Sequence, residues 1–189
     1  MRAIIVLAVV TAALHLGLRY CVAPPFGRDV QDRFIERDKY IPSLRDQRLP
    51  DNDGALTAPN LLRWINDPAN QINRFGYVKP VILPLDLLFL IALGSLLGCL
   101  AQLLASRIGL ISGWPVIVWW IFPLAYMLCD FIEDGLIVIL LSWPSLLHDT
   151  SFQALRIFTR AKLFTIGAAV LEVGALIATW IAARLDIIG

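Results

Sequence analysis

Four long apolar stretches divide the chain, and they fall at residues 3–20, 80–105, 114–142 and 153–184. An α-helix rises ~1.5 Å per residue, so about 20 apolar residues cross the ~30 Å hydrocarbon core of a bilayer. Each stretch is close to this length or longer. The pattern therefore predicts an all-α fold, an integral membrane four-helix bundle, built as a single domain over residues 1–189.

The segment between the first two spans, residues 21–79, is hydrophilic and carries nine basic and eight acidic residues. Apolar residues recur at helical spacing over about 28–40, which predicts a short amphipathic helix. Thr57 is suited to cap a second helix. Three aromatic side chains are typical of the lipid headgroup level, namely those of Trp64, Phe75 and Tyr77. Because the segment holds these apolar side chains, we expect an ordered, partly helical cap over the membrane domain.

Composition agrees with a membrane protein, since 58% of the residues are hydrophobic, against about 45–50% in an ordinary soluble domain. The net charge of +1 gives no basis for nucleic-acid binding. Cys21, Cys99 and Cys129 form no Cys-x-x-Cys pair, which argues against a thiol–disulfide enzyme. The first apolar stretch follows Arg2 and lacks an Ala-x-Ala cleavage site, so we expect a retained helix rather than a signal peptide.

The third span contains an acidic motif, Asp130, Glu133 and Asp134. Residues at i, i+3 and i+4 lie on one face of a helix, so the three carboxylates are expected side by side. Ionisable groups inside a bilayer are costly and are found facing a partner, water or a ligand. The motif therefore predicts a buried polar site.

Ionisable residues of the other spans fall at a similar depth. Counted at ~1.5 Å per residue from the side of the long loop, Asp86, His15, Arg160 and Lys162 lie in the same leaflet as the acidic motif. Arg160 is the expected ion-pair partner of the carboxylates. Lys162 is the second candidate partner, although its position on the helix predicts that it points to nearly the opposite face, from which it could extend toward the headgroups instead.

Two interpretations of this polar layer remain open. In one, the ion pairs only fix the register of the helices. In the other, which we favour, the residues line a cavity that opens toward the loop and binds a ligand. The candidate ligand-binding residues are Asp86, Tyr126, Asp130, Glu133, Asp134 and Arg160. No metal site is expected, because no metal-ligand spacing of the His-Glu-x-x-His type occurs.

Two further features concern helix packing. Gly94 and Gly98 form a Gly-x-x-x-Gly motif in the second span, which lets another helix approach closely. We expect that helix to belong to the same bundle, with helix–helix association between two chains as the alternative. Pro123 is predicted to kink the third span shortly before the acidic motif.

Two short motifs carry a resemblance to a known group of proteins. Leu85-Asp86-Leu87-Leu88-Phe89 opens the second span, and Asp130-Phe131-Ile132-Glu133-Asp134 lies in the third, which ends in Trp-Pro. This combination resembles a family of small bacterial four-span membrane proteins with Leu-Asp-x-Leu-Phe-Pro and Asp-Tyr-x-Glu-Asn motifs. The resemblance covers about residues 57–184. It implies the four-span architecture, a bacterial cell membrane and importance of the acidic residues, but no activity. Leu90 and Asp134 depart from the Pro and Asn of the family.

Three functions are compatible with the sequence. The one we favour is a protein that binds or transports a lipid, an amine or a cation at the polar site. The alternatives are an accessory or structural subunit of a membrane complex, and a lipid-modifying membrane enzyme that uses a carboxylate as acid and base. The sequence identifies no cofactor and no catalytic residue.

The orientation in the membrane depends on two opposing signals. More basic residues lie near the span ends on the side of the long loop, which favours a cytoplasmic loop. The balanced charge of residues 21–79 and the position of Arg2 before the first span favour an exported loop. We expect the exported arrangement.

Overall fold

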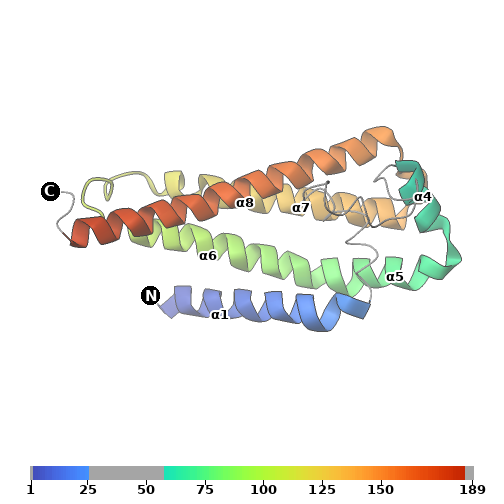
Figure 1. Ribbon diagram of the computed structural model, residues 1–189, viewed down its shortest axis with the longest axis horizontal. Helices are drawn as coiled ribbons and strands as arrows, with labels where there is room; N and C mark the ends of the chain where they lie inside the picture. The colour runs from blue at the N-terminus through green and yellow to red at the C-terminus, as the bar shows by residue number, and fades with distance from the viewer. Residues whose placement is uncertain (1, 26–57, 186–189) are drawn as a thin grey trace, which may run out of the picture.

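The computed structural model describes residues 2–25 and 58–185, and within these ranges the chain is helical with no strand. Four long helices lie side by side (Figure 1). They are α1 (Arg2–Leu16), which continues into η1 (Gly17–Val22), α6 (Leu87–Ala105), α7 (Ile121–Ser142) and α8 (Asp149–Arg184). The prediction of an all-α fold is confirmed. The predicted helix over 28–40 and the Thr57 cap lie outside the described residues.

Within residues 2–25 and 58–185, three helices are long and apolar enough to cross a membrane, namely Arg2–Val22, Pro68–Ala105 and Asp149–Arg184. Helix α7 has 22 residues but carries Asp130, Glu133 and Asp134 within its central part. Every 18-residue stretch of α7 contains these three carboxylates, whereas each of the other three helices has a stretch of that length with at most two charged residues.

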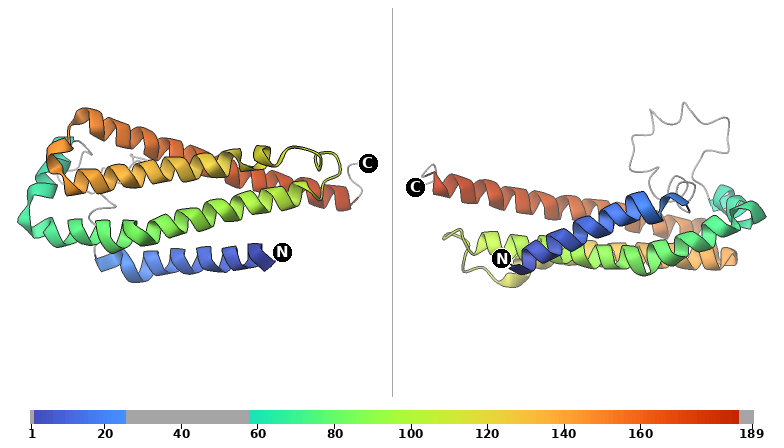
Figure 2. Two further views of the ribbon diagram at one scale, coloured as in Figure 1. Left: turned by 180° about the vertical axis from the view of Figure 1, so that it is seen from behind. Right: turned by 90° about the horizontal axis from the view of Figure 1, so that it is seen from below.

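Helix α1 lies at the edge of the bundle against α6, and Figure 1 and the left view of Figure 2 show α6 between α1 and α8. Thr11 is the buried residue of α1, whereas large apolar side chains such as Val6 and Val9 are exposed. Exposed apolar surface of this extent is typical of a helix that faces lipid.

The inward face of α8 follows a repeat of three and four residues. The residues of this repeat are Phe152, Leu155, Thr159, Lys162, Ile166, Ala169, Val173, Leu176 and Trp180. Such spacing keeps one stripe of a helix against its neighbours. Helix α7 has a matching stripe in Tyr126, Asp130, Glu133, Ile137 and Leu140, all buried. The polar residues are therefore part of the packing surface between α7 and α8.

Two apolar clusters fill the bundle. The loop-end cluster contains residues of η4, α4, α7 and α8, including Ile82, Trp64, Ile137, Leu141 and Leu155. The terminus-end cluster contains Leu97, Ala101, Ala105, Ile108, Trp119, Ala169, Val173 and Leu176. In α8, the polar residues of the stripe lie between residues of the two clusters. In α7, the residues of the loop-end cluster follow the acidic motif, and the terminus-end cluster is joined by Trp119, which precedes the helix.

A helical cap covers the loop end of the bundle (Figure 1). It consists of α4 (Ala58–Asn66), η3 (Pro68–Asn70) and α5 (Gln71–Gly76). The side chain of Asp67 accepts a hydrogen bond from Ala69 N at 2.9 Å, which starts the turn between α4 and α5. Of the three aromatic residues expected at the lipid headgroup level, Trp64 and Tyr77 are buried in the loop-end cluster, whereas Phe75 is exposed.

The start of the second span is irregular. Segment η4 (Tyr77–Asp86) contains Pro80 and Pro84, and the backbone at Lys79 and Leu83 is not helical. Proline lacks the amide hydrogen that a helix interior needs, so regular helix begins only at Leu87. Pro123, by contrast, lies in the first turn of α7, where a missing N–H is tolerated. Pro123 therefore lies where the regular helix begins, and it does not kink the helix before the acidic motif as expected.

The glycines of α6 pack against α7 and the preceding segment η5 (Val116–Trp120). A Cβ at Gly94 would collide with the side chain of Met127, and one at Gly98 would lie 2.8 Å from the ring of Trp120. At both glycines, the side chain that approaches closely therefore belongs to the same chain.

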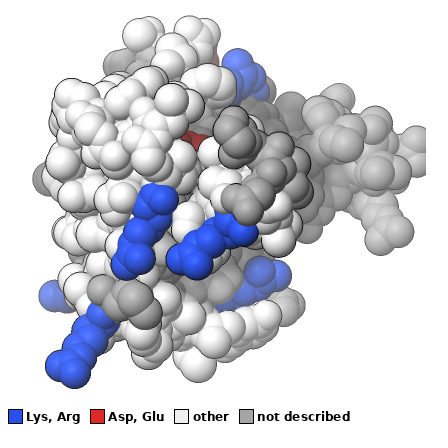
Figure 3. Space-filling view, turned by 90° about the vertical axis from the view of Figure 1, so that its left-hand side faces the viewer, with Lys and Arg blue, Asp and Glu red and all other residues white. Residues whose placement is uncertain are grey.

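The end of the bundle that holds the start of α1 and the end of α8 is basic. Arg2 begins α1, Arg107 follows α6, and Arg184 ends α8 with its guanidinium 5.3 Å from the ring centre of Trp180. Figure 3 shows basic side chains spread over this end and almost no acidic surface.

Candidate functional site

An ion pair joins α7 to α8 in the middle of the packing surface. The Lys162 Nζ atom lies 2.7 Å from Glu133 Oε2 and also pairs with Asp130 Oδ1. Glu133 is 0% exposed and Asp130 is 2% exposed. The Lys162 side chain is 16% exposed, so the lysine reaches the carboxylates from the side of the bundle. The prediction that Lys162 points away from the acidic motif is wrong.

Thr159 completes the surroundings of Glu133. Its hydroxyl donates a hydrogen bond to Glu133 Oε1 at 2.5 Å and lies 3.1 Å from the carbonyl oxygen of Leu155, one turn earlier. Lys162 contacts the other oxygen, Oε2. Both oxygens of this buried carboxylate are therefore engaged, as a charge in an apolar interior requires.

Asp134 follows Glu133 but lies outside this ion pair. The residue is buried, with only 6% of its surface exposed. Its Oδ2 atom is buried and has no hydrogen-bond partner among the described residues. An unpaired buried polar group costs ~1–3 kcal/mol, and a charged one costs more. Asp134 is thus the polar group of the layer that remains unsatisfied.

Asp86 lies near enough to Asp134 for its negative charge to act on that carboxyl group. It is partly buried and ends the irregular segment η4, directly before α6. Two carboxylates that interact in an apolar setting favour a bound proton or cation, because both cannot readily be ionised together. The pair brings the second and third predicted spans to one site.

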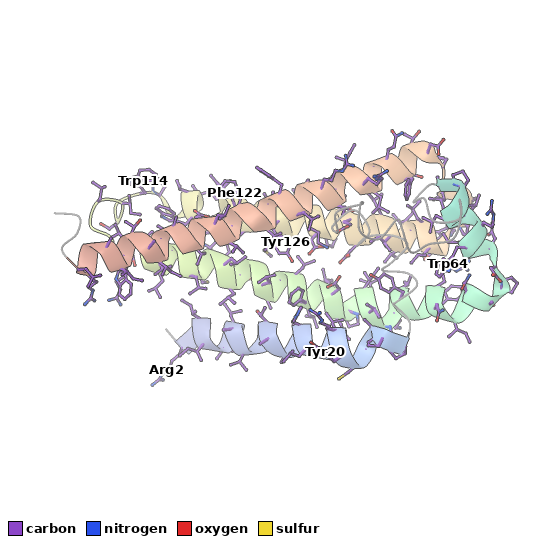
Figure 4. All side chains as sticks on the ribbon, in the orientation of Figure 1. Arg2, Tyr20, Trp64, Trp114, Phe122 and Tyr126 are labelled. Atoms are coloured by element: carbon purple, nitrogen blue, oxygen red, sulfur yellow. The ribbon has the colours of Figure 1, made fainter. Side chains whose placement is uncertain are left out.

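Two tyrosines border the acidic residues. Tyr126 lies one turn before Asp130 on α7, where its phenol interacts with that carboxylate, and Figure 4 shows it in the middle of the bundle. Tyr77, from η4, interacts with Asp86 and Asp134. Both phenols are buried and supply polar groups beside the carboxylates.

The predicted site residues therefore fall into two groups, those that the structure brings together and those that it leaves exposed. The structure brings together Asp86, Tyr126, Asp130, Glu133 and Asp134 around Lys162. Arg160 is exposed on α8, and Lys162 takes the ion-pair position expected for it. His15 is also exposed, and its ring lies 5.7 Å from that of Phe89 on α6.

Thr159 and Tyr77 were not among the predicted site residues, and Lys162 was ranked second to Arg160 as a partner of the carboxylates. For Thr159 and Lys162, the signal was present in the spacing of α8. Leu155, Thr159 and Lys162 continue the three-and-four repeat of apolar residues, whereas Arg160 does not. Nothing in the sequence indicated that Tyr77 would turn inward, since this depends on the irregular backbone of η4.

The described residues contain no group of three or more His, Cys, Asp or Glu side chains that could hold a metal ion. Comparisons with protein-family models, with curated proteins and with solved structures gave no match. The geometry of the polar layer is therefore the basis for assigning a function to this chain.

Proposed function

We propose that the chain is a four-span integral membrane protein, with α7 as the fourth span. The carboxylates of α7 face α8, where Lys162 compensates Asp130 and Glu133. The opposite face of α7 is apolar, with Leu124, Leu128 and Phe131 exposed. A helix with an apolar outer face and internally compensated charges is suited to a bilayer. Its 22 residues extend over ~33 Å.

We propose further that the polar layer binds a small cationic ligand, and that Asp134 contacts it. The observation that carries this proposal is the buried Oδ2 atom of Asp134, which has no hydrogen-bond partner among the described residues. A cationic N–H donor would supply both the missing hydrogen bond and the missing positive charge. Charge-assisted hydrogen bonds of this kind are about twice as strong as neutral ones. Asp86 supports the proposal, since its carboxylate adds negative potential at Asp134.

The proposed roles differ within the layer. Lys162, Glu133, Asp130 and Thr159 form a closed structural unit that holds α7 against α8. Asp134 and Asp86 form the part that receives the ligand. A buried ion pair next to a binding carboxylate fixes its position, because the side chains around it have few alternative arrangements.

The test is thermal unfolding of the purified full chain in phosphatidylcholine nanodiscs with a series of primary amines from ethylamine to dodecylamine. Wild type should be stabilised by at least one of them, and a ligand at 100 times its Kd contributes ~2.7 kcal/mol. D134N should lose this stabilisation, because the neutral amide cannot pair with an ammonium group.

The matched control is D149N, since Asp149 is exposed at the start of α8. This variant should respond to amines as wild type does. Stabilisation that is equally large in wild type and D134N, for every amine tested, would show that Asp134 does not bind the cation.

A further inference from the structure

The polar layer is covered by apolar residues at both of its ends along the bundle axis. Toward the loop lie Ile82, Ile137 and Leu141, which are almost completely buried in the loop-end cluster. Toward the chain termini lie Ala101 and Ala169 of the terminus-end cluster, which are also fully buried. A hydrated ion that moved along the axis would have to pass close-packed apolar side chains, where it loses its hydration.

The layer reaches the molecular surface at Lys162. This side chain is 16% exposed while its Nζ atom contacts the carboxylates inside. Lys162 is 13 residues from Asp149 at the start of α8, about 20 Å along the helix. Phe131 and Phe164 lie within ~3 Å of this level along α7 and α8, and both are exposed. Exposed aromatic side chains therefore lie at the level of the site, and the exposed Arg160 lies at the same distance from Lys162 along α8 as Phe164 does.

Lys162 also shows which chemistry this layer accommodates. Its side chain is an ammonium group on a four-carbon chain, and the ammonium group lies against the carboxylates. An amphiphilic amine has the same division between a cationic end and a hydrocarbon end. Its chain would remain in the bilayer, so only the ammonium group needs room inside the protein.

We infer that the ligand of the polar layer is a cationic amphiphile, a long-chain amine or a lipid with an ammonium headgroup, which enters laterally from the bilayer. This inference rests on the proposed function, since it names the ligand class of the same carboxylate, Asp134. Lateral entry accounts for three observations together: the apolar closure along the axis, the exposure at Lys162 and the exposed aromatic residues at the same level.

The experiment compares dodecylamine, ethylamine and dodecanol with the full chain in phosphatidylcholine nanodiscs near pH 7. Dodecylamine provides both charge and chain, ethylamine provides the charge, and dodecanol provides the chain. We expect dodecylamine to raise the Tm of wild type by several degrees. Ethylamine at the same aqueous concentration and dodecanol at the same content in the bilayer should leave the Tm unchanged. D134N should not respond to dodecylamine.

The outcomes separate this inference from the proposed function. If ethylamine stabilises wild type as strongly as dodecylamine and D134N abolishes both effects, the site takes its cation from water and the lateral route is wrong. If dodecylamine acts equally on wild type and D134N, the proposed function fails as well.

Asp134→Glu keeps the negative charge and is the alternative test variant if D134N does not fold. It should retain the response to dodecylamine and remain insensitive to dodecanol. A loss of the dodecylamine response in folded Asp134→Glu would count against an ion pair at this position.

Discussion

Lys162 Nζ lies 2.7 Å from Glu133 Oε2 and thereby links α8 to α7 between two apolar clusters. The same ammonium group pairs with Asp130, so one cation serves two carboxylates. This relationship leaves Asp134 as the next acidic residue on the helix, buried and without a partner for Oδ2 among the described residues. The structural and the ligand-binding parts of the layer are therefore adjacent on one helix turn.

Replacing Lys162 by Met should destabilise the protein strongly, because it leaves the carboxylates of Asp130 and Glu133 buried without their cation. Removal of one partner from a buried ion pair costs about 3–5 kcal/mol. Equilibrium unfolding in detergent micelles measures the loss. Adding D130N and E133Q to the Met variant should restore part of the stability.

The control for this change is R160M, since Arg160 is an exposed basic residue of the same helix. Loss of an exposed charge usually changes stability by ~1 kcal/mol or less. If R160M costs as much as the change at Lys162, the assignment of Lys162 as the partner of the acidic motif would have to be abandoned.

Thr159→Val should lower the free energy of unfolding by about 1–3 kcal/mol, because Glu133 Oε1 loses its hydrogen-bond donor while the shape of the side chain is kept. Thr179→Val is the matched control. Thr179 is exposed on the same helix and donates to the carbonyl oxygen of Ala175. Its substitution should change stability by ~0.5 kcal/mol or less. Equal effects at the two threonines would contradict a special role of the Thr159 hydroxyl.

Gly98→Ala should destabilise the contact between α6 and η5. A Cβ at this position would lie 2.8 Å from ring atoms of Trp120, and overpacking of this kind typically costs 1–3 kcal/mol. Gly174→Ala provides the comparison, because no atom lies within 4 Å of a Cβ added there. Thermal unfolding of the two variants should differ in Tm by several degrees. A Tm that is lower for Gly174→Ala than for Gly98→Ala would contradict this expectation.

Ser151→Ala should weaken the start of α8. His148 Nδ1 accepts a hydrogen bond from Ser151 N, and Ser151 Oγ accepts one from His148 N, so the two residues form a capping box. Loss of such a cap costs about 0.5–2 kcal/mol. Hydrogen exchange should become faster at the first amides of α8. Ser112→Ala, on an exposed turn, is the control and should leave exchange at the start of α8 unchanged. If Ser151→Ala also leaves the exchange rates of these amides unchanged, the capping box does not stabilise the helix start.

The number of spans can be tested by labelling single cysteines in a variant without Cys21, Cys99 and Cys129. Ser112 lies between α6 and η5, and Ser145 lies between α7 and α8, and both are exposed. If α7 spans the bilayer, cysteines at these two positions react with an impermeant reagent from opposite sides. With the long loop exported, the cysteine at 145 should react from outside. Reaction of both positions from one side would exclude α7 as a span.

The sequence predicted the helices well, because each rests on a long apolar run that ends at clear signals. Ser142 is the last residue of α7, and Trp143-Pro144 follows it as expected. The start of the second span was harder to predict. Pro80 and Pro84 interrupt it, and their effect depends on how Tyr77 and Ile82 pack in the loop-end cluster.

The sequence indicated the acidic half of the candidate site, but for the basic half it favoured Arg160 over Lys162. Asp130, Glu133 and Asp134 share a helix face by spacing alone, which needs no tertiary information. The choice between Arg160 and Lys162 depended on which stripe of α8 turns inward. That stripe is set by Leu155, Ala169 and Val173, which were not used to orient the helix.

The pairing of Lys162 with the carboxylates of α7 bears on how the protein would be assembled in the membrane. An Asp at the centre of a lone helix opposes insertion by about 2.5–3.5 kcal/mol, so α7 alone would insert poorly. Its compensating cation arrives only with α8, the next helix to be synthesised. We therefore expect insertion of α7 to be delayed until α8 has been synthesised, so that the two helices enter the bilayer together as a hairpin. The order of synthesis would then determine when the polar layer forms.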